Sequence, residues 1–216
     1  MASIDQLLRR ARYLDSIHNL PQLPPDAGIE VAIAGRSNAG KSSLINRICD
    51  QKSLARTSRT PGRTRQLVFF QLDPLRHLVD LPGYGYAKVS GDLRRHWQGL
   101  IQTYLERRQA LAGLVIVMDI RHPLKDNDKE LVSWAAATGL PQHLVLTKAD
   151  KLGRGRQAQA LHAVQKQVSD QISVQCFSAT SGQGSDVLLQ VLADWFQPEQ
   201  PLTADALTDP SDHADR

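Results

Sequence analysis

Eight consecutive residues, Gly35-Arg36-Ser37-Asn38-Ala39-Gly40-Lys41-Ser42, fit the pattern GxxxxGK[ST]. In this pattern the backbone N–H groups of a glycine-bounded loop surround an anion, and the N-terminus of the following helix adds partial positive charge. The lysine reaches the β- and γ-phosphates of a nucleotide, and the final hydroxyl is a ligand of Mg²⁺. The sequence therefore predicts a phosphate-binding loop in which Lys41 neutralises charge and Ser42 binds Mg²⁺.

The surroundings of this loop favour that interpretation over an ordinary glycine-rich turn. An apolar, β-branched run at 29–34 precedes it and is typical of a buried strand. The segment 42–48 follows it and carries apolar residues at helical spacing. Strand, loop and helix in this order are the context in which the pattern binds phosphate.

A second short motif, Asp80-Leu81-Pro82-Gly83, follows a later apolar run at 77–80. An Asp at the carboxyl end of a strand can hold Mg²⁺ through water. The N–H of Gly83 can approach a γ-phosphate because glycine has no Cβ. A plain turn is the alternative, so the motif gains weight only from its position, one hairpin after the loop.

Two further motifs follow predicted strands and suit a purine base. In Thr147-Lys148-Ala149-Asp150 the Asp carboxylate can accept two hydrogen bonds from adjacent N–H donors, which guanine has and adenine lacks. The stem of Lys148 can lie along the base. The tripeptide Ser178-Ala179-Thr180 could offer a backbone N–H to the base oxygen.

The elements that must position these motifs alternate between short apolar strands and helices. This alternation predicts a three-layer α/β fold with helices on both faces of a six-stranded, mostly parallel sheet. Only four residues separate the second and third strands, which predicts an antiparallel hairpin and one antiparallel edge strand. The expected strands are 31–34, 67–72, 77–80, 114–120, 143–147 and 173–177, and the expected helices are 41–50, 91–108, 127–137, 155–168 and 185–196.

Composition predicts three parts in the 216-residue chain. Residues 1–27 should form an amphipathic helix over Ile4 to Ile17 and a Pro-rich connector, and 28–196 should form the main domain. Residues 197–216 are rich in Pro and Asp, and we expect them to be disordered. This tail holds five acidic residues and Arg216, so it contributes −4 to the net charge of +4 and leaves +8 for residues 1–196.

The positive charge of residues 1–196 suggests an anionic partner besides a nucleotide, although it could serve solubility alone. Cys49 and Cys176 fall inside predicted elements, which suggests buried thiols in a reducing compartment. No apolar run reaches the roughly 20 residues that span a bilayer, and the N-terminus lacks a signal peptide's features. We expect a cytoplasmic protein that contacts neither DNA nor membrane, and a monomer.

Taken together, the four motifs resemble the GTP-binding G domains. The chain resembles the EngB (YihA/YsxC) family of bacterial ribosome-biogenesis GTPases from about Leu20 to Phe196. Four stretches carry this likeness: 54–64 (Leu-Ala-Arg-Thr-Ser-Arg-Thr-Pro-Gly-Arg-Thr), 80–87 (Asp-Leu-Pro-Gly-Tyr-Gly-Tyr-Ala), 119–123 (Asp-Ile-Arg-His-Pro) and 147–150. The resemblance implies Mg²⁺-dependent GTP hydrolysis and a switch in assembly of the large (50S) ribosomal subunit, needed for growth, cell division and septation.

The resemblance also implies the role of each matching position. The loop 35–42 and the motifs at Asp80-Leu81-Pro82-Gly83, Thr147–Asp150 and Ser178–Thr180 would bind the nucleotide. The switch I segment Gly62-Arg63-Thr64-Arg65-Gln66 would join them, with Thr64 as a second Mg²⁺ ligand. On chemistry alone Thr57 and Thr60 compete with Thr64, and the preceding Pro61-Gly62 and the motif alignment favour Thr64.

Two positions depart from common G domains. Many have Asn in place of Thr147, so we expect modest affinity for guanine nucleotides. Tyr84 occupies the position of the Gln that orients the attacking water in signalling GTPases, and we interpret it as a packed aromatic residue. Hydrolysis in the free protein should then be slow, with Lys41 and Asn38 as the catalytic candidates. Asn38 could hold a K⁺ ion beside the phosphates, as in related G domains, or could simply cap a turn.

Basic residues on and near the switches provide a possible contact to rRNA phosphates. Solvated loop charge is the alternative, and the family resemblance favours contact with rRNA. The residues are Arg56, Arg59, Arg63, Arg65, Arg94, Arg95 and His96. Two other functions compete with the GTPase switch. One is an RNA-binding scaffold that senses GTP and GDP with negligible turnover. The other is an ATP-dependent P-loop kinase, for which the sequence offers no acceptor site.

Overall fold

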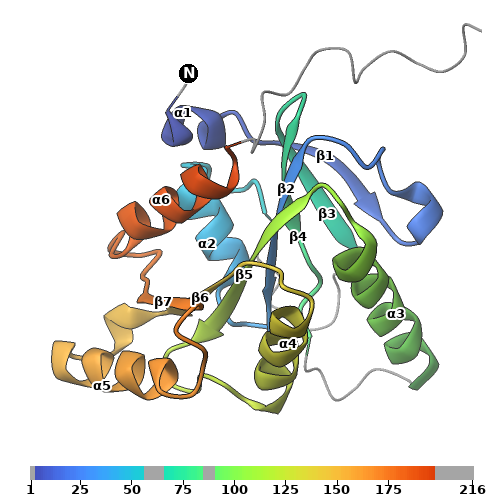
Figure 1. Ribbon diagram of the computed structural model, residues 1–216. Coiled ribbons are helices and arrows are strands. Elements are labelled where there is room, and N and C mark those ends of the chain that lie inside the picture. The colour runs from blue at the N-terminus through green and yellow to red at the C-terminus, as the bar shows by residue number, and fades with distance from the viewer. Residues whose placement is uncertain (1–2, 56–65, 85–90, 198–216) are drawn as a thin grey trace, which may run out of the picture.

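The computed structural model describes residues 3–55, 66–84 and 91–197, with the side chains of 91–98 outside the description (Figure 1). The described residues form a central sheet flanked by helices. In chain order the elements are α1 (Ile4–Arg9), β1 (Arg12–Ile17), η1 (Leu20–Gln22), β2 (Ile29–Gly35), α2 (Lys41–Ile48), β3 (Leu67–Asp73), β4 (Arg76–Asp80), α3 (Gly91–Arg107), β5 (Leu111–Asp119), α4 (Asp126–Ala137), β6 (Gln142–Thr147), η2 (Ala149–Lys151), α5 (Arg154–Gln165), β7 (Ser173–Cys176) and α6 (Ser185–Trp195).

The sheet has seven strands among the described residues, in the order β1-β3-β4-β2-β5-β6-β7. The five strands β4, β2, β5, β6 and β7 are parallel, and β3 is antiparallel to both of its neighbours. The predicted hairpin is confirmed as β3 and β4, in which Val68 pairs with Asp80. The three-layer α/β class is therefore confirmed, with the antiparallel region at one edge of the sheet.

The expectation of six strands and of a helix through Ile17 is wrong. Helix α1 ends at Arg9, and Arg12–Ile17 forms an additional edge strand that pairs antiparallel with β3. Leu7, Leu8 and Ala11 carry the helical spacing and are buried, whereas the first four side chains of β1 are exposed. The part of the chain that precedes residue 28 thus contributes a strand to the central sheet.

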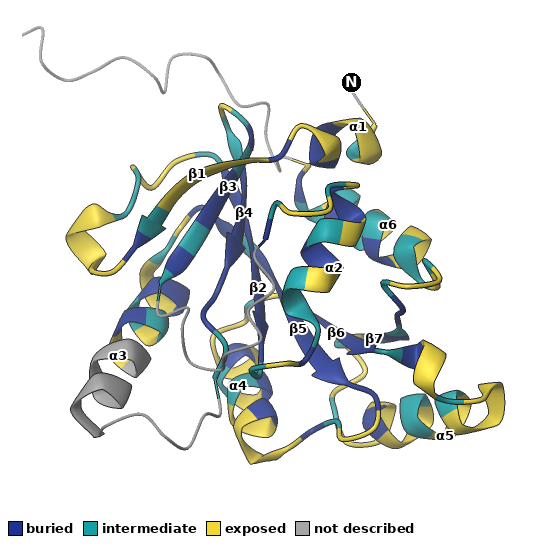
Figure 2. Ribbon diagram, turned by 180° about the vertical axis from the view of Figure 1, so that it is seen from behind, coloured by how far each residue is buried: buried dark blue, intermediate teal, exposed yellow. Residues whose placement is uncertain are grey.

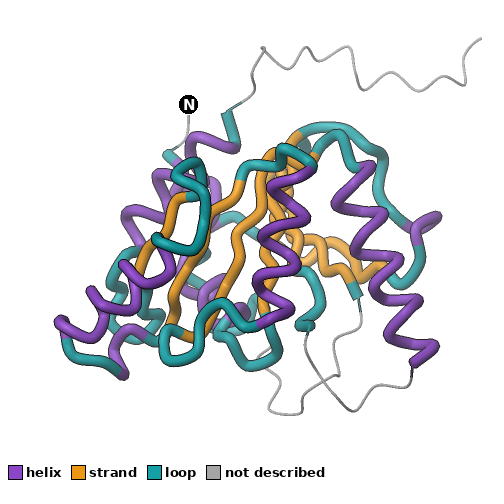
Figure 3. Tube along the Cα trace, turned by 60° about the horizontal axis from the view of Figure 1, so that its bottom comes forward, coloured by secondary structure: helices purple, strands orange, loops and turns teal. Residues whose placement is uncertain are grey.

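Alternating side chains of the central strands divide the core between two layers. Figure 2 shows the central strands largely in the dark blue of buried residues. On β2, Val31 and Ile33 face the cluster that includes buried residues of α1, α2 and α6. Ala32 and Ala34 face the opposite cluster, which includes residues of α3, α4 and α5. Every residue of β2 is buried, as expected for a parallel strand covered on both faces. Figure 3 shows the sheet between these two helical layers.

A buried ion pair fixes the edge where β2 begins. The carboxylate of Glu30 accepts hydrogen bonds from Arg108 at 2.6 Å and from the Tyr104 hydroxyl at 2.8 Å. Arg108 also donates to the carbonyl oxygen of Pro24 at 2.8 Å. This pair ties the end of α3 to the connector before β2, opposite the edge that carries the candidate site.

Candidate functional site

The carboxyl ends of the five parallel strands meet at one edge of the sheet, which is where open α/β sheets bind ligands. Three of the predicted motifs begin at or directly after these ends, at Gly35 of β2, Asp80 of β4 and Thr147 of β6. The fourth, at Ser178, follows β7 by one residue. The fold therefore brings together motifs that span more than half of the chain.

The loop 36–40 turns tightly from β2 into α2. A Cβ on Gly35 would lie 2.6 Å from the carbonyl oxygen of Val117, so only glycine fits beside β5. Gly40 has φ 97° and Asn38 has φ 65°, both in the left-handed region. Because Gly40 is the N-cap of α2, the loop ends on the positive end of a helix dipole. This backbone can surround an anion, as the sequence predicts.

Lys41 and Asp80 form an ion pair beside the loop. The Nζ of Lys41 contacts Oδ1 of Asp80, and the two side chains are only 10% and 8% exposed. Burial raises the pKa of the Asp80 carboxyl, and the charge of Lys41 opposes that rise. A lysine and a carboxylate held together at a phosphate loop can serve a phosphate group and a hydrated cation.

Gly83 brings the Asp80–Gly83 motif against the loop. A Cβ on Gly83 would lie 3.0 Å from the Ser37 hydroxyl oxygen and 3.1 Å from the Ser37 nitrogen. The N–H of Ser37 donates to the carbonyl oxygen of Tyr84 at 3.2 Å. Leu81 is buried and its N–H donates to Ile33 at 2.9 Å, so the segment continues along β2. Any group bound by the loop therefore lies next to this segment.

Thr147, the last residue of β6, contacts the loop 36–40 directly. Its hydroxyl contacts the carbonyl oxygen of Ala39, and it lies 3.0 Å from the carbonyl oxygen of Met118 in β5. The side chain is buried, with the residue 3% exposed. The shorter Thr thus reaches the loop directly at a position where many G domains carry Asn.

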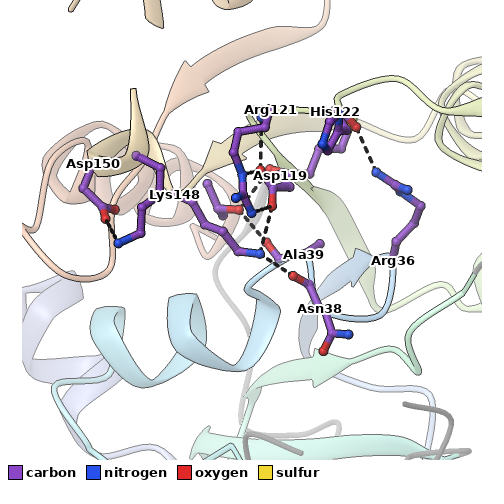
Figure 4. A network of polar contacts seen from close by, with 11 residues as sticks. Arg36, Asn38, Ala39, Asp119, Arg121, His122, Lys148 and Asp150 are labelled. Atoms are coloured by element: carbon purple, nitrogen blue, oxygen red, sulfur yellow. Dashed lines mark hydrogen bonds and ion pairs between the residues drawn. The ribbon is translucent and has the colours of Figure 1, made fainter. Parts of the chain in front are cut away.

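Lys148 reaches across the same edge (Figure 4). Its Nζ donates to the carbonyl oxygen of Asn38 at 2.6 Å and to Oδ2 of Asp119 at 2.9 Å. Asp119 also accepts hydrogen bonds from the Arg121 side chain at 2.7 and 2.9 Å. The hydrogen bonds from Arg121, followed by those from Lys148, hold the pKa of the Asp119 carboxyl far below its usual value. Two acceptors from different elements therefore hold the Nζ of Lys148 in place.

Asp150 and Ser178 meet where β6 and β7 end. The Ser178 hydroxyl donates to Oδ1 of Asp150 at 2.7 Å, and Lys151 lies 3.2 Å from Oδ2. The hydrogen bond from Ser178 is the main cause that lowers the pKa of the Asp150 carboxyl. Ser178 is fully buried, whereas Thr180 is exposed. The carboxylate is therefore ionised and oriented, as an acceptor for paired N–H donors must be.

The remaining predicted residues divide into two groups. Arg36, Ala39, Ser42, Pro82, Ala149 and Ala179 lie within the segments already described at this edge. Gln66 instead contacts His18, with its Nε2 3.2 Å from the ring Nδ1 of His18 in the segment after β1. Gly62, Arg63, Thr64 and Arg65 lie outside the described residues, as do Arg56 and Arg59 and the side chains of Arg94, Arg95 and His96.

The donors at this edge fit a Mg²⁺ ion that is shared with phosphate and water. Ser42 lies in the first turn of α2, and Asp80 supplies a buried carboxylate. Among the residues whose side chains the structure describes, 3–55, 66–84 and 99–197, no cluster of three His, Cys, Asp or Glu residues could form a dedicated metal site. Mg²⁺ is usually held by one or two protein oxygens together with substrate phosphates, which matches this set.

Two carboxylates at the site were given no chemical role in the sequence analysis. Asp119 ends β5, so the strand-end criterion that selected Asp80 and Thr147 could have selected it as well. Asp128 lies in the first turn of α4 and accepts a hydrogen bond from the Tyr84 hydroxyl at 2.9 Å. The expectation that Tyr84 is a packed aromatic is confirmed, because it packs against the core cluster beside α3 and α4.

Comparisons with known proteins agree with this geometry. A family model described as a 50S ribosome-binding GTPase matches residues 30–148. The chain is 57% identical over 204 residues to a probable GTP-binding protein EngB of Xanthomonas campestris pv. campestris, covering 93% of this chain and 99% of that protein. It is 58% identical over 194 residues to the protein of the same description from Stenotrophomonas maltophilia, covering 88% and 97%.

Solved structures share the fold at lower sequence identity. The crystal structure of a probable GTP-binding protein engB has a TM-score of 0.62 at 20% identity, covering 77% of this chain and 98% of that one. A variant of Aquifex aeolicus Era bound to GDP and aluminium fluoride also has a TM-score of 0.62, at 22% identity, covering 82% and 60%. In the described residues, no helix combines the length and apolar character needed to cross a membrane.

Proposed function

The chain belongs to the EngB family of GTP-binding P-loop GTPases, and we propose that it acts as a GTP-dependent switch in assembly of the large (50S) ribosomal subunit. It binds GTP and GDP and hydrolyses GTP, and GTPases of this family generally use Mg²⁺. The matching family model, described as 50S ribosome-binding, supports the assembly role. The charge of +8 on residues 1–196 also suits a partner rich in RNA phosphates.

The observation that carries the site assignment is the set of bonds between the guanine motif and the phosphate loop. Thr147 and Lys148 bind the carbonyl oxygens of Ala39 and Asn38, so base and phosphate subsites share one rigid edge. In the proposed complex the backbone of 35–42 surrounds the phosphates and Asp150 accepts the guanine N–H donors. Ser178–Thr180 border the base on its other side.

The proposed hydrolysis relies on charge neutralisation and positioning. Lys41 moves from Asp80 to the β- and γ-phosphates, and the N–H of Gly83 faces the γ-phosphate. Ser42 and Thr64, with Asp80 through water, would hold Mg²⁺, which would supply positive charge beside the phosphates. A water molecule attacks the γ-phosphorus in line as the bond to the β-phosphate oxygen breaks, and its proton ends on the released phosphate. In this proposal no side chain is placed as a general base, and the Tyr84 hydroxyl is engaged in a hydrogen bond to Asp128.

Asp150→Asn tests the assignment of the base. An Asn presents an N–H donor and one oxygen acceptor, so it suits xanthine better than guanine. We expect GTP affinity to fall at least tenfold and xanthosine triphosphate affinity to rise. Asp170→Asn, at an exposed position, is the matched control and should bind GTP as the unaltered chain does. Unchanged GTP affinity in Asp150→Asn would refute the assignment.

We also propose that K⁺ speeds hydrolysis from a site beside Asn38, where it would stabilise developing charge as an arginine finger does. The left-handed backbone of Asn38 places this residue at the apex of the loop. Single-turnover hydrolysis should be faster in potassium than in sodium buffer, and Asn38→Gly should remove the difference. Equal rates in the two buffers would contradict the K⁺ site but leave the GTPase site intact.

Co-sedimentation with ribosomal subunits tests the assembly role. The chain should sediment with large-subunit precursors in the presence of a non-hydrolysable GTP analogue, and less with GDP. Rising salt should weaken binding if RNA phosphates are the contact. Co-sedimentation that changes neither with the bound nucleotide nor with the salt concentration would contradict the proposal. Cells depleted of the protein should accumulate incomplete large subunits before growth and division slow.

A further inference from the structure

A fully buried carboxylate on α4 connects two parts of the site that no motif links. Asp128 lies in the first turn of α4, with its side chain 0% exposed. Its Oδ2 accepts a hydrogen bond from the backbone N–H of Lys125 at 3.0 Å, which caps the helix. Two further groups contact the same carboxylate. The Tyr84 hydroxyl donates to Oδ1 at 2.9 Å, and Nε of Arg36 lies 3.2 Å from Oδ2.

Helix capping alone does not account for this arrangement. An exposed carboxylate caps a helix and complements its dipole without losing water, and the exposed Asp126 occupies the same turn. Burial disfavours the charged form of Asp128 and raises its pKa, which the Tyr84 hydroxyl and Arg36 partly offset. Burial also raises the pKa of Tyr84 well above its usual value, so Tyr84 is a neutral hydrogen-bond donor. The carboxylate is held by its contacts to the site.

Both partners of Asp128 belong to segments that the proposed function places beside the γ-phosphate. Arg36 is the second residue of the phosphate loop, and Tyr84 directly follows Gly83. Their backbones pair as a parallel bridge, in which the N–H of Ser37 donates to Tyr84 at 3.2 Å. Arg36 also donates to the carbonyl oxygen of His122 at 2.8 Å, just before α4 (Figure 4). The loop, the residues 83–84 and the start of α4 thus form a closed ring.

We propose that Asp128 is a positioning residue for GTP hydrolysis, which sets the spacing between the phosphate loop and Gly83 through Arg36 and Tyr84. A γ-phosphate lies between these two segments, and the rate of its transfer depends steeply on their geometry. The Tyr84 side chain serves as an anchor for the Gly83 backbone and does not orient the attacking water. GDP has no γ-phosphate, so its binding does not depend on this spacing.

Tyr84→Phe and Asp128→Asn test the proposal in the full chain. Single-turnover hydrolysis of bound GTP should slow about tenfold in each, while the GDP dissociation constant stays within about twofold of the unaltered chain. The double variant should be no slower than the slower single variant, because the two groups act as one unit. Tyr13→Phe and Asp126→Asn replace the same residue types at exposed positions and should hydrolyse GTP at the unaltered rate.

The outcomes separate positioning from a merely structural role. Hydrolysis at the unaltered rate in Tyr84→Phe would overturn the proposal, because this change removes only the oxygen that contacts Asp128. A loss of GDP affinity in proportion to the loss of rate would overturn it too, since general loosening affects both. If Asp128→Asn does not fold, Tyr84→Phe decides the question alone. The unaltered chain, measured in parallel, establishes the GTPase activity on which the comparison depends.

Discussion

Replacing Thr147 by Val tests how strongly the guanine motif supports the phosphate loop. Val has the shape of Thr but lacks the hydroxyl, so the change removes the contacts to Ala39 and Met118 and little else. A hydroxyl carries one proton, so it donates to only one of these carbonyl oxygens at a time. The variant therefore loses one hydrogen bond and leaves a buried carbonyl oxygen without this donor.

The expected magnitude follows from the burial of the contact. Losing one hydrogen bond at a residue that is 3% exposed should cost about 1–2 kcal/mol. If the hydroxyl mainly fixes the loop in its phosphate-binding shape, roughly a 5–30-fold loss of both GTP and GDP affinity results. If it mainly stabilises the fold, the melting temperature should drop by about 2–8 °C.

Two measurements separate the effect on nucleotide affinity from the effect on the stability of the fold. They are calorimetric binding of GDP and thermal unfolding without nucleotide. Thr147→Ser keeps the hydroxyl and should retain most of the affinity. Thr138→Val is the matched control, because the exposed Thr138 also donates its hydroxyl to a carbonyl oxygen, that of Ala135 at 3.0 Å. That contact is only partly buried, so its loss should change both measurements less than the loss at Thr147 does. Unchanged affinity and unchanged melting temperature in Thr147→Val would refute the bracing role.

Three further outcomes follow from the ionisable groups. Asp119→Asn should weaken GDP binding about tenfold by calorimetry, because Lys148 loses a charged partner. Since the folded pKa of Asp119 is lowered, the difference from the unaltered chain should persist down to its usual value of about 4 and shrink only at lower pH. Glu30→Gln leaves Arg108 buried without its main counter-charge and should lower the unfolding free energy in urea by about 3 kcal/mol. Burial raises the pKa of Cys49 to about 12, so iodoacetamide at pH 8 should label it only after unfolding, as mass spectrometry would show.

Much of the site could be predicted because its chemistry lies at strand ends. The apolar run at 29–34 is continuous, so it fixes β2 and places the loop that follows it. The same reasoning places Asp80 and Thr147, since parallel strands end at one edge. Their contacts within that edge join residues far apart in the sequence, as Thr147 and Ala39 show. Local sequence was sufficient for these positions because each motif follows its own strand directly.

The strand β1 escaped prediction for a physical reason. Its first four residues are exposed, so the apolar alternation that identifies a half-buried strand is missing. Leu14 continues the helical spacing of Leu7, Leu8 and Ala11 in the sequence. In the structure, however, Leu14 is 40% exposed and belongs to the strand. Its position depends on pairing with β3, more than 50 residues away, which no local pattern encodes.

The contacts of Asp119 and Asp128 were also outside the reach of sequence patterns. Asp128 and the exposed Asp126 are both aspartates in the first turn of α4, and only the tertiary structure distinguishes the two. Asp119 binds Lys148, 29 residues later, because β5 and β6 are adjacent and parallel and end together at this edge. Residues that orient other residues leave a weaker local signature than those that contact a ligand.

The bonds across this edge also imply that base and phosphate recognition are not independent. The carbonyl oxygens of Asn38 and Ala39 belong to the loop 36–40, yet their donors belong to the motif that we propose reads the base. A change that displaces Lys148 therefore disturbs the loop, even if the base contact itself survives. Weaker binding of inorganic pyrophosphate in Lys148→Ala would demonstrate this coupling, because that ligand has no base. Equal pyrophosphate affinity would show instead that the loop keeps its shape without the contact from Lys148.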